Sequence, residues 1–177
     1  MAKSKLRKIP ASDAAKEFLE FFFPIHYTVG MTVEETLCNN VLTRQQAIIL
    51  WIIRSKGGPT KAMNRKVIEQ DMADWYDITS SAISKAIRSL SKAPLKLVTI
   101  EEDPDSGREK VVVLTPKGEK FVEQMYENGC NLIKLATDQM TPEEVDMGIY
   151  MFQRISEIFA STPALSPRSR KELKAAE

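Results

Sequence analysis

The sequence predicts a mainly α-helical chain with one small antiparallel β-hairpin, and the observations that predict it lie between Met72 and Gly118. A short helix leads into a tight turn there. A second helix, over residues 78–90, repeats its apolar residues at spacings of three and four. Two short strands joined by a charged loop follow over residues 97–115. Two helices at a turn followed by a β-ribbon form a winged helix-turn-helix, whose commonest use is to read duplex DNA.

The second helix has two chemically different faces. Its apolar residues share one side and are expected to be buried: Ala82, Ile83, Ala86, Ile87 and Leu90. Its polar residues share the other side and are the candidate DNA contacts: Ser80, Ser81, Ser84, Lys85 and Arg88. Short hydroxyls near a helix start allow close approach to phosphates or bases, and the cations reach a phosphate or a guanine edge. Thr79 is a natural N-cap for this helix.

The preceding helix is expected over residues 65–76. Its inner face is expected to consist of Val67, Ile68, Met72, Ala73 and Tyr76. Residues 61–64 before it read as a loop. The turn after it contains Asp77, a residue type that tolerates left-handed backbone. We therefore expect the two helices to form the helix-turn-helix unit.

The predicted wing alternates in the way that a two-faced strand does. Val112 and Leu114 point to one side and Val111 and Val113 to the other. Residues 103–107 form a turn cluster of Asp, Pro, Ser and Gly. Arg108 and Lys110 follow it, where cations are placed to enter a minor groove. The sequence therefore adds Arg108 and Lys110 to the candidate DNA contacts.

Three segments together resemble one protein family. Residues 103–118 are similar to the wing of the MarR (multiple antibiotic resistance regulator) family, residues 79–90 to its recognition helix, and residues 42–50 to an earlier helix start of that family. The chain departs from the family pattern at Ser106, where an Asp usually precedes the wing Arg, and at Asp77, where a turn Gly is usual. Residues 92–96 replace a Gly-containing link. Asp105 is the neighbouring carboxylate that takes the place of the missing Asp in this comparison.

The resemblance implies a homodimer that binds a pseudo-palindromic operator on double-stranded DNA and acts as a repressor. Its dimer is built from the terminal helices, and here the apolar stripe consists of Val145, Ile149, Phe152, Ile155 and Phe159, together with Phe18, Phe22 and Phe23. Burying such stripes against a second copy is economical, and twofold symmetry suits a palindrome. A small aromatic effector that releases the DNA is left open.

The expected organisation follows from these assignments. Residues 1–11 form a basic arm, 12–42 an N-terminal dimerisation helix region, 43–118 the winged-helix domain, 119–160 the C-terminal dimerisation helices and 161–177 a tail. Pro24 is expected to kink or break the first helix. Capping boxes are expected at Thr32, Thr43 and Thr141. One long helix is expected from Pro116 to about Met140.

Composition narrows the functional classes. The chain has 177 residues, 43% of them hydrophobic, and a net charge of +1, which suits one packed domain with helical extensions. The sequence contains no nucleophile motif, phosphate loop or metal-ligand cluster, so we expect no enzyme activity, no metal and no cofactor. It contains no membrane span or signal core, which predicts a cytoplasmic protein. The competing interpretation is a winged helix used for protein interaction or replication-type DNA binding, without an operator.

The remaining candidate residues are aromatic or cysteine. The aromatic residues are expected mostly in the core: Phe21, Phe22, Phe23, Tyr27, Trp51 and Trp75. Among them Phe22, Tyr27 and Trp51 are also candidates for lining an effector cavity. Cys38 and Cys130 lie far apart and are interpreted as small buried apolar residues, with redox activity left open.

Overall fold

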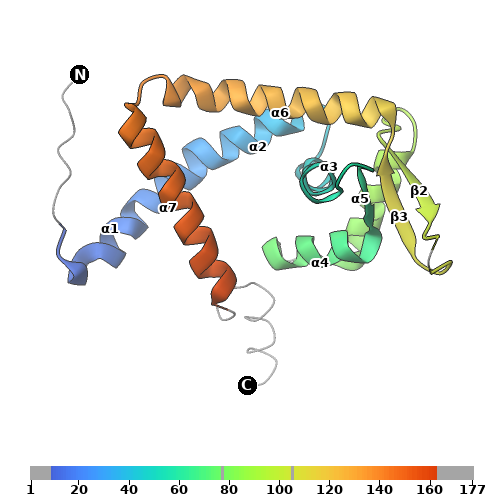
Figure 1. Cartoon of the computed structure of the whole chain (residues 1–177), viewed down its shortest axis with the longest axis horizontal. Coiled ribbons are helices and arrows are strands. Elements are labelled where there is room, and N and C mark those ends of the chain that lie inside the picture. Colours follow the sequence, from blue (N-terminus) through green and yellow to red (C-terminus); the bar gives the residue numbers. More distant parts are fainter. Residues whose placement is uncertain (1–8, 77, 105, 163–177) are drawn as a thin grey trace.

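The computed structural model describes residues 9–76, 78–104 and 106–162. One long helix, α6 (Pro116–Thr137), runs along the whole molecule. The winged-helix elements lie at the N-terminal end of α6, and two long helices, α1 (Ala11–Pro24) and α7 (Pro142–Ser161), lie at its other end (Figure 1). The molecule therefore separates a compact module from a projecting pair of helices.

Residues 11–38 form an N-terminal arm that is helical along its whole length. α1 passes at Pro24 into a π-helical segment, η1 (Ile25–Gly30), and then into α2 (Met31–Cys38). The irregularity expected at Pro24 is thus a change in hydrogen bonding and not a break. The capping box expected at Thr32 is wrong, because Gly30 and Met31 already have helical backbone angles. The Thr32 hydroxyl instead donates to the carbonyl oxygen of Thr28, at 2.6 Å.

The central helix of the core is α3 (Arg44–Lys56), and it begins with the predicted capping box. The Thr43 hydroxyl accepts from the Gln46 amide, and the Gln46 side chain accepts from the Thr43 amide. Its buried apolar residues are Ala47, Ile49, Leu50, Ile52 and Ile53. Ile48 and Trp51, which the sequence placed inside, are only half-buried because they face α2 and α6 at the margin of the core.

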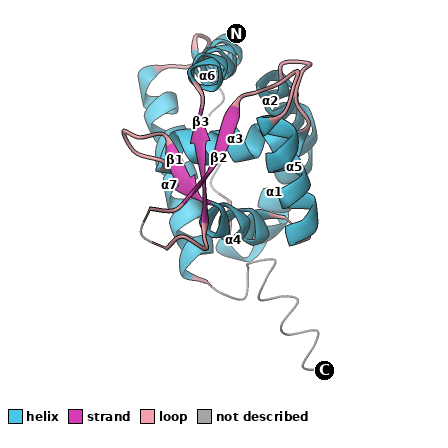
Figure 2. Ribbon diagram, turned by 90° about the vertical axis from the view of Figure 1, so that its right-hand side faces the viewer, coloured by secondary structure: helices cyan, strands magenta, loops and turns pink. Residues whose placement is uncertain are grey.

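A third strand corrects the sequence-based assignment of residues 61–64 to a loop. β1 (Ala62–Asn64) pairs antiparallel with β3 (Lys110–Leu114), which also pairs with β2 (Val98–Glu102). The strand order is β1-β3-β2, with β3 in the centre (Figure 2). Three residues are too short to show an alternating pattern, so the sequence alone does not reveal this strand.

The helix-turn-helix consists of α4 (Arg65–Trp75) and α5 (Ser80–Ser91). Ile68 and Met72 of α4 are fully buried, as expected, but Val67 is 43% exposed and lies outside the core. Asp77 in the turn lies outside the described residues. The buried residues of α5 are Ile83, Ala86, Ile87 and Leu90, so its predicted inner face is confirmed apart from half-buried Ala82.

The C-terminal helices have the caps that the sequence predicts. Thr115 caps α6, and Thr141 and Glu144 form a capping box at the start of α7. α6 ends at Thr137, slightly earlier than expected, and α2 packs along it. At the closest point of this packing, a Cβ on Gly129 would lie 3.0 Å from the Leu37 side chain. A small residue therefore allows α2 and α6 to approach each other.

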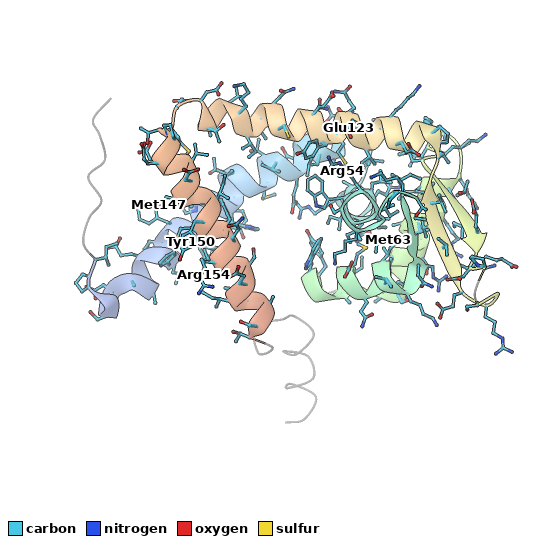
Figure 3. The ribbon with its side chains drawn as sticks, viewed as in Figure 1. Arg54, Met63, Glu123, Met147, Tyr150 and Arg154 are labelled. Carbon is cyan, nitrogen blue, oxygen red and sulfur yellow. The ribbon has the colours of Figure 1, made fainter. Side chains whose placement is uncertain are left out.

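The projecting helices leave large apolar side chains in solvent. On α1 and η1 these are Phe18, Leu19, Phe21, Phe22, Phe23, Ile25, Tyr27 and Val29. On α7 they include Met147, Ile149, Tyr150, Phe152, Ile155, Ile158 and Phe159. Met147, Tyr150 and Arg154 mark α7 in Figure 3, far from the winged-helix end. The assignment of the N-terminal aromatic residues and Trp75 to the core is therefore wrong for the single chain.

Gly118 is a position that should accept no side chain. A Cβ there would lie 1.9 Å from the carbonyl oxygen of Leu97, which is held in place by a 3.0 Å bond from the Thr115 amide. Gly118→Ala should lower the free energy of unfolding by about 3 kcal/mol, the upper end of the usual cost of overpacking. Urea titration followed by circular dichroism measures it. Lys120→Ala, an exposed change in the same turn, is the control and should have little effect.

Candidate nucleic-acid interface

The second helix of the helix-turn-helix, α5, is fixed at its start and on one flank. The Thr79 hydroxyl accepts from the Ala82 amide at 3.2 Å, which satisfies an otherwise free helix-start donor. On the flank, the Gln46 side-chain amide donates to the hydroxyl of exposed Ser89 at 3.0 Å. Gln46 is buried and also caps α3, so the two helices share one polar side chain. α5 is thereby held at a set position on α3.

The outward face of α5 is a basic stripe. Ser81, Lys85, Arg88 and Lys92 recur at helical spacing and are all at least partly exposed. Lys85, Arg88 and Lys92 also line a hollow of about 430 Å³ at the C-terminal end of the helix. Within the described ranges, no carboxylate forms an ion pair with any of these three cations. Lys92 was missed in the sequence because it follows the last turn of the predicted helix, although its spacing from Arg88 continues the stripe.

The sequence suggested that the five candidates on α5 share one face, but in the structure they do not. Ser81, Lys85 and Arg88 point outward, whereas Ser80 and Ser84 turn toward α4. There the Ser80 hydroxyl donates to Glu69 Oε2 at 2.9 Å, and the Ser84 hydroxyl lies 3.5 Å from Glu69 Oε1. The carboxylate also forms an ion pair with Arg65 at 3.0 Å. Glu69 belongs to this site and was not identified from the sequence.

The loop end of the wing is tied to the start of α4. The Asn64 side-chain amide donates to Glu109 Oε2 at 2.5 Å and to Asp103 Oδ2 at 3.3 Å. Lys66 forms an ion pair with the same Glu109 carboxylate. Hydrogen bonds from Lys66 and then Asn64 hold the pKa of Glu109 below its usual value. These bonds join β1, α4 and the residue that precedes β3, so the wing is positioned relative to the helix-turn-helix.

The two predicted wing cations have different surroundings. Arg108 is exposed beside the turn, with no ion-pair partner among the residues that the structure describes. Lys110 lies at the start of β3 and pairs with Glu102 across the strands at 2.8 Å, which lowers the pKa of Glu102. Asp105, the proposed substitute for the family's Asp, lies outside the described residues. Of the two cations, Arg108 is therefore the one whose charge is available at the tip.

A second, apolar cavity lies away from this surface, between α2, α3 and α6. Its volume is about 300 Å³, and its lining includes Trp51, Tyr126, Cys130 and Ile133. The Arg54 guanidinium covers the Tyr126 ring at 3.7 Å on the α3 side (Figure 3). Of the three residues predicted to line an effector cavity, only Trp51 borders this apolar cavity, and its role there stays a prediction.

Phe22 and Tyr27, the other two, lie on the exposed arm. The Phe22 ring stacks on His26 and the Tyr27 ring on Phe23, with centroids 5.7 Å apart in each pair. Neither residue lines the cavity between α2, α3 and α6. Their place is the apolar face of α1 and η1, because residues at spacings of four on a helix fall on one side.

The cysteines differ in exposure. Cys130 is exposed, whereas Cys38 is partly buried. Burial, and then the charge of Glu34, raise the pKa of the Cys38 thiol above its ordinary value. A raised pKa lowers the thiolate fraction at neutral pH and so disfavours oxidation at Cys38. The same Glu34 forms an ion pair with Arg44 and accepts from the Tyr76 hydroxyl at 3.4 Å.

Other kinds of site are sparse. Among the residues described, there is no group of three or more His, Cys, Asp or Glu side chains that could hold a metal ion. Within the same residues, every helix is too short or too polar to cross a bilayer. Polar side chains do converge on the surface formed by α4, α5 and the wing.

Comparison with known proteins agrees with this geometry. Residues 42–118 match the family described as "Winged helix DNA-binding domain". No curated protein matches the sequence. A MarR family protein from Bacillus stearothermophilus is structurally similar over 86% of this chain and 100% of its own, with a TM-score of 0.71 and 14% identity.

Two further solved structures are similar. One is a MarR family transcriptional regulator from Streptomyces coelicolor in complex with DNA, with a TM-score of 0.62, 16% identity and 88% and 92% of the two chains covered. The other is BpsR of Bordetella bronchiseptica, whose DNA binding is regulated by 6-hydroxynicotinic acid, with a TM-score of 0.56, 21% identity and 85% and 98% covered. The chain therefore has a winged-helix fold similar to that of MarR family structures, and the fold class predicted from the sequence is confirmed.

The exposed position of Arg108 leads to a prediction about salt. Arg108→Ala should weaken binding to specific and random duplexes alike. It should also reduce the slope of log affinity against log salt by about one unit, the value for a side chain that neutralises one phosphate. Fluorescence anisotropy at several salt concentrations measures both. Lys110→Ala is the matched comparison and should change less, because Glu102 already pairs with that cation. If Arg108→Ala keeps the affinity and the salt slope of the wild type, the wing is a structural hairpin that does not contact DNA.

Proposed function

We propose that this chain is a sequence-specific, DNA-binding transcriptional regulator that acts as a homodimeric repressor in the cytoplasm. One observation carries the proposal. Lys85, Arg88 and Lys92 form an outward stripe of cations on a helix whose apolar inner face is buried. The wing beside that helix presents exposed Arg108 and is tied to α4 by Asn64.

The chemistry of this surface suits the major groove of duplex DNA. An α-helix fits that groove, and an Arg side chain can donate two hydrogen bonds to the O6 and N7 atoms of guanine. Arg88 lies mid-stripe and is the candidate for that contact, with Ser81 and Lys85 nearer the helix start. Lys92 lies at the end of the stripe, where a phosphate is the expected partner. The wing then extends the contact to the neighbouring backbone or minor groove through Arg108.

The dimer is proposed from the apolar faces of α1 and α7. Phe152 is 72% exposed and Phe18 59%, on helices that project from the compact module. A second copy is the economical cover for such faces, and it would present two recognition helices with twofold symmetry. Two helices spaced by about 34 Å read two successive major-groove segments, which is the reason for expecting a pseudo-palindromic operator.

Effector control is proposed for the cavity between α2, α3 and α6. Its apolar wall and the rings of Trp51 and Tyr126 suit a small aromatic molecule. α2 belongs to the projecting arm and α3 to the DNA-binding module, so a ligand between them can favour one arrangement over another. In the similar protein BpsR, 6-hydroxynicotinic acid regulates DNA binding. For this chain we propose release of the operator when an aromatic ligand occupies the cavity.

The DNA proposal is tested by selecting duplexes from a random pool and measuring their affinity. Arg88→Ala should weaken binding to the selected duplex by roughly 1–3 kcal/mol if the side chain contacts guanine in two places. Lys120→Ala, which removes one cation from α6, is the control and should bind as the wild type does. If Arg88→Ala and Lys85→Ala both bind normally, α5 does not enter the groove. Binding without any sequence preference would favour the alternative, a winged helix used for protein interaction or replication-type DNA binding.

The dimer is tested by light scattering at micromolar concentration. The wild type should have about twice the chain mass of 20.0 kDa. Phe152→Glu should shift the protein toward the monomer, because it places a charge in the proposed apolar interface. Gln153→Glu adds the same charge at the neighbouring exposed position and is the matched control. A monomeric wild type that binds palindromic DNA tightly would refute the dimer proposal.

Effector control is tested by adding a panel of small aromatic acids to the preformed protein–DNA complex. An active compound should release the DNA and quench the fluorescence of Trp51. Ile133→Trp fills the cavity and should abolish release while DNA binding is retained. Asn131→Trp, an exposed change on the same helix that does not line the cavity, should still respond. Release that is equally strong in Ile133→Trp would place the effector elsewhere.

A further inference from the structure

Glu69 on α4 binds the recognition helix through two serine hydroxyls. Its Oε2 atom lies 2.9 Å from the Ser80 hydroxyl and its Oε1 atom 3.5 Å from the Ser84 hydroxyl. The Glu69 side chain is 19% exposed and pairs with Arg65, which is 41% exposed. Ser80 is exposed, whereas Ser84 is half-buried. The carboxylate is thus largely covered, and Ser80 lies between it and the surface.

This arrangement determines which hydrogen-bonding role remains for Ser80. A serine hydroxyl carries one hydrogen and two acceptor lone pairs, and a carboxylate can only accept. In the bond to Glu69 the hydroxyl must therefore donate. Its hydrogen is used inside the protein, and its free lone pairs can accept from outside. The 2.9 Å bond makes this constraint stronger for Ser80 than for Ser84, whose distance is at the limit of a hydrogen bond.

An acceptor at this position distinguishes between the partners that DNA offers. Phosphate oxygens, guanine O6 and N7, and thymine O4 are all acceptors, so none of them can bond to a hydroxyl whose hydrogen is already engaged. In the major groove the donors are the amino groups N6–H₂ of adenine and N4–H₂ of cytosine. Ser80 is therefore unsuited to a phosphate, the partner that its residue type alone would suggest.

We propose that Ser80 reads the exocyclic amino group of an adenine or a cytosine, and that Glu69 is the positioning residue that makes it an acceptor. The inference rests on the proposed function, because it requires α5 to enter the major groove. Arg65 has a supporting role: its ion pair offsets the negative charge of Glu69 beside a phosphate backbone. Base specificity at this position thus depends on a side chain of the preceding helix.

The experiment uses modified DNA and the full chain. The duplex preferred by the wild type is first selected from a random pool. Each adenine of the half-site is then replaced by purine and each cytosine by pyrimidin-2-one, which removes the amino group and keeps the ring. We expect one position at which this removal weakens wild-type binding about 5- to 150-fold, the range for leaving one partner of a buried hydrogen bond unsatisfied.

Three variants assign that position to the proposed residues. In Ser80→Ala, removal of the amino group there should change affinity less than about twofold, because the acceptor is absent. In Glu69→Ala the penalty should be smaller than in the wild type, because the released hydroxyl can turn its hydrogen toward the base. Ser81→Ala keeps the Ser80–Glu69 pair and should retain the full penalty. Thermal melting checks that Glu69→Ala is folded. If it is not, the wild type and Ser80→Ala decide the question by themselves.

The outcomes separate the inference from the function on which it rests. If the wild type selects a duplex but no amino-group removal depends on Ser80, the inference is wrong and the proposed function stands. The inference is also wrong if Glu69→Ala is folded and keeps the full penalty, because Ser80 then needs no positioning. If the wild type prefers no duplex over a scrambled one, the proposed function fails and the inference fails with it.

Discussion

The position of α5 depends on one buried amide side chain. Gln46 accepts from the Thr43 amide at 2.8 Å and donates to the Ser89 hydroxyl at 3.0 Å, so both ends of its amide are bonded. A buried amide left without these partners would cost roughly 1–3 kcal/mol. The first bond requires α3 to start at Thr43. The second requires α5 to lie with Ser89 beside the Gln46 side chain. Around this contact the apolar side chains of the core then exclude water, and the basic stripe of α5 faces outward.

The chain keeps two kinds of surface apart. Polar and cationic groups gather on α5 and the wing, whereas exposed apolar groups gather on α1 and α7. α6 spans the distance between them, and α2 packs along α6 through Gly129 (Figure 1). The apolar cavity lies beside α6, between the two surfaces.

Much of the fold was predictable because its signals are local. The hydroxyls of Thr43, Thr79 and Thr141 cap the helices that the sequence assigned to them, since a cap acts within three residues. The capping box predicted at Thr32 was wrong, because the local sequence pattern does not show that the residues before Thr32 are already helical. The strand β1 was not predicted, because it is defined only by its pairing with Val111, Val112 and Val113, which lie far away in the sequence.

The candidate site was predictable only in part for the same reason. The outward residues Ser81, Lys85 and Arg88 follow from helical spacing alone. The roles of Ser80 and Ser84 do not, because Glu69 lies on another helix and a single sequence shows no pairing between them. Likewise, Lys110 was predicted to be a DNA contact because the sequence did not reveal its ion pair with Glu102 on the neighbouring strand. Side-chain pairs between elements decide which charges and hydroxyls remain available, and these pairs come from tertiary structure.

The π-helical segment η1 determines the direction in which the arm presents its aromatic face. In a π-helix the amide bonds to the fifth residue back, so the segment holds about one residue more than an α-helical turn would. One residue corresponds to about 100° of rotation in an α-helix. If η1 became α-helical with all of its residues kept, the aromatic face of α1 would therefore turn by about a quarter turn relative to α2. Deleting one residue between Ile25 and Gly30 would instead leave a uniform α-helix with nearly the same faces, because the residue that the π-helical turn absorbs is the one removed. The hydrogen-bonding pattern of η1 thus sets which way the aromatic side chains of α1 point.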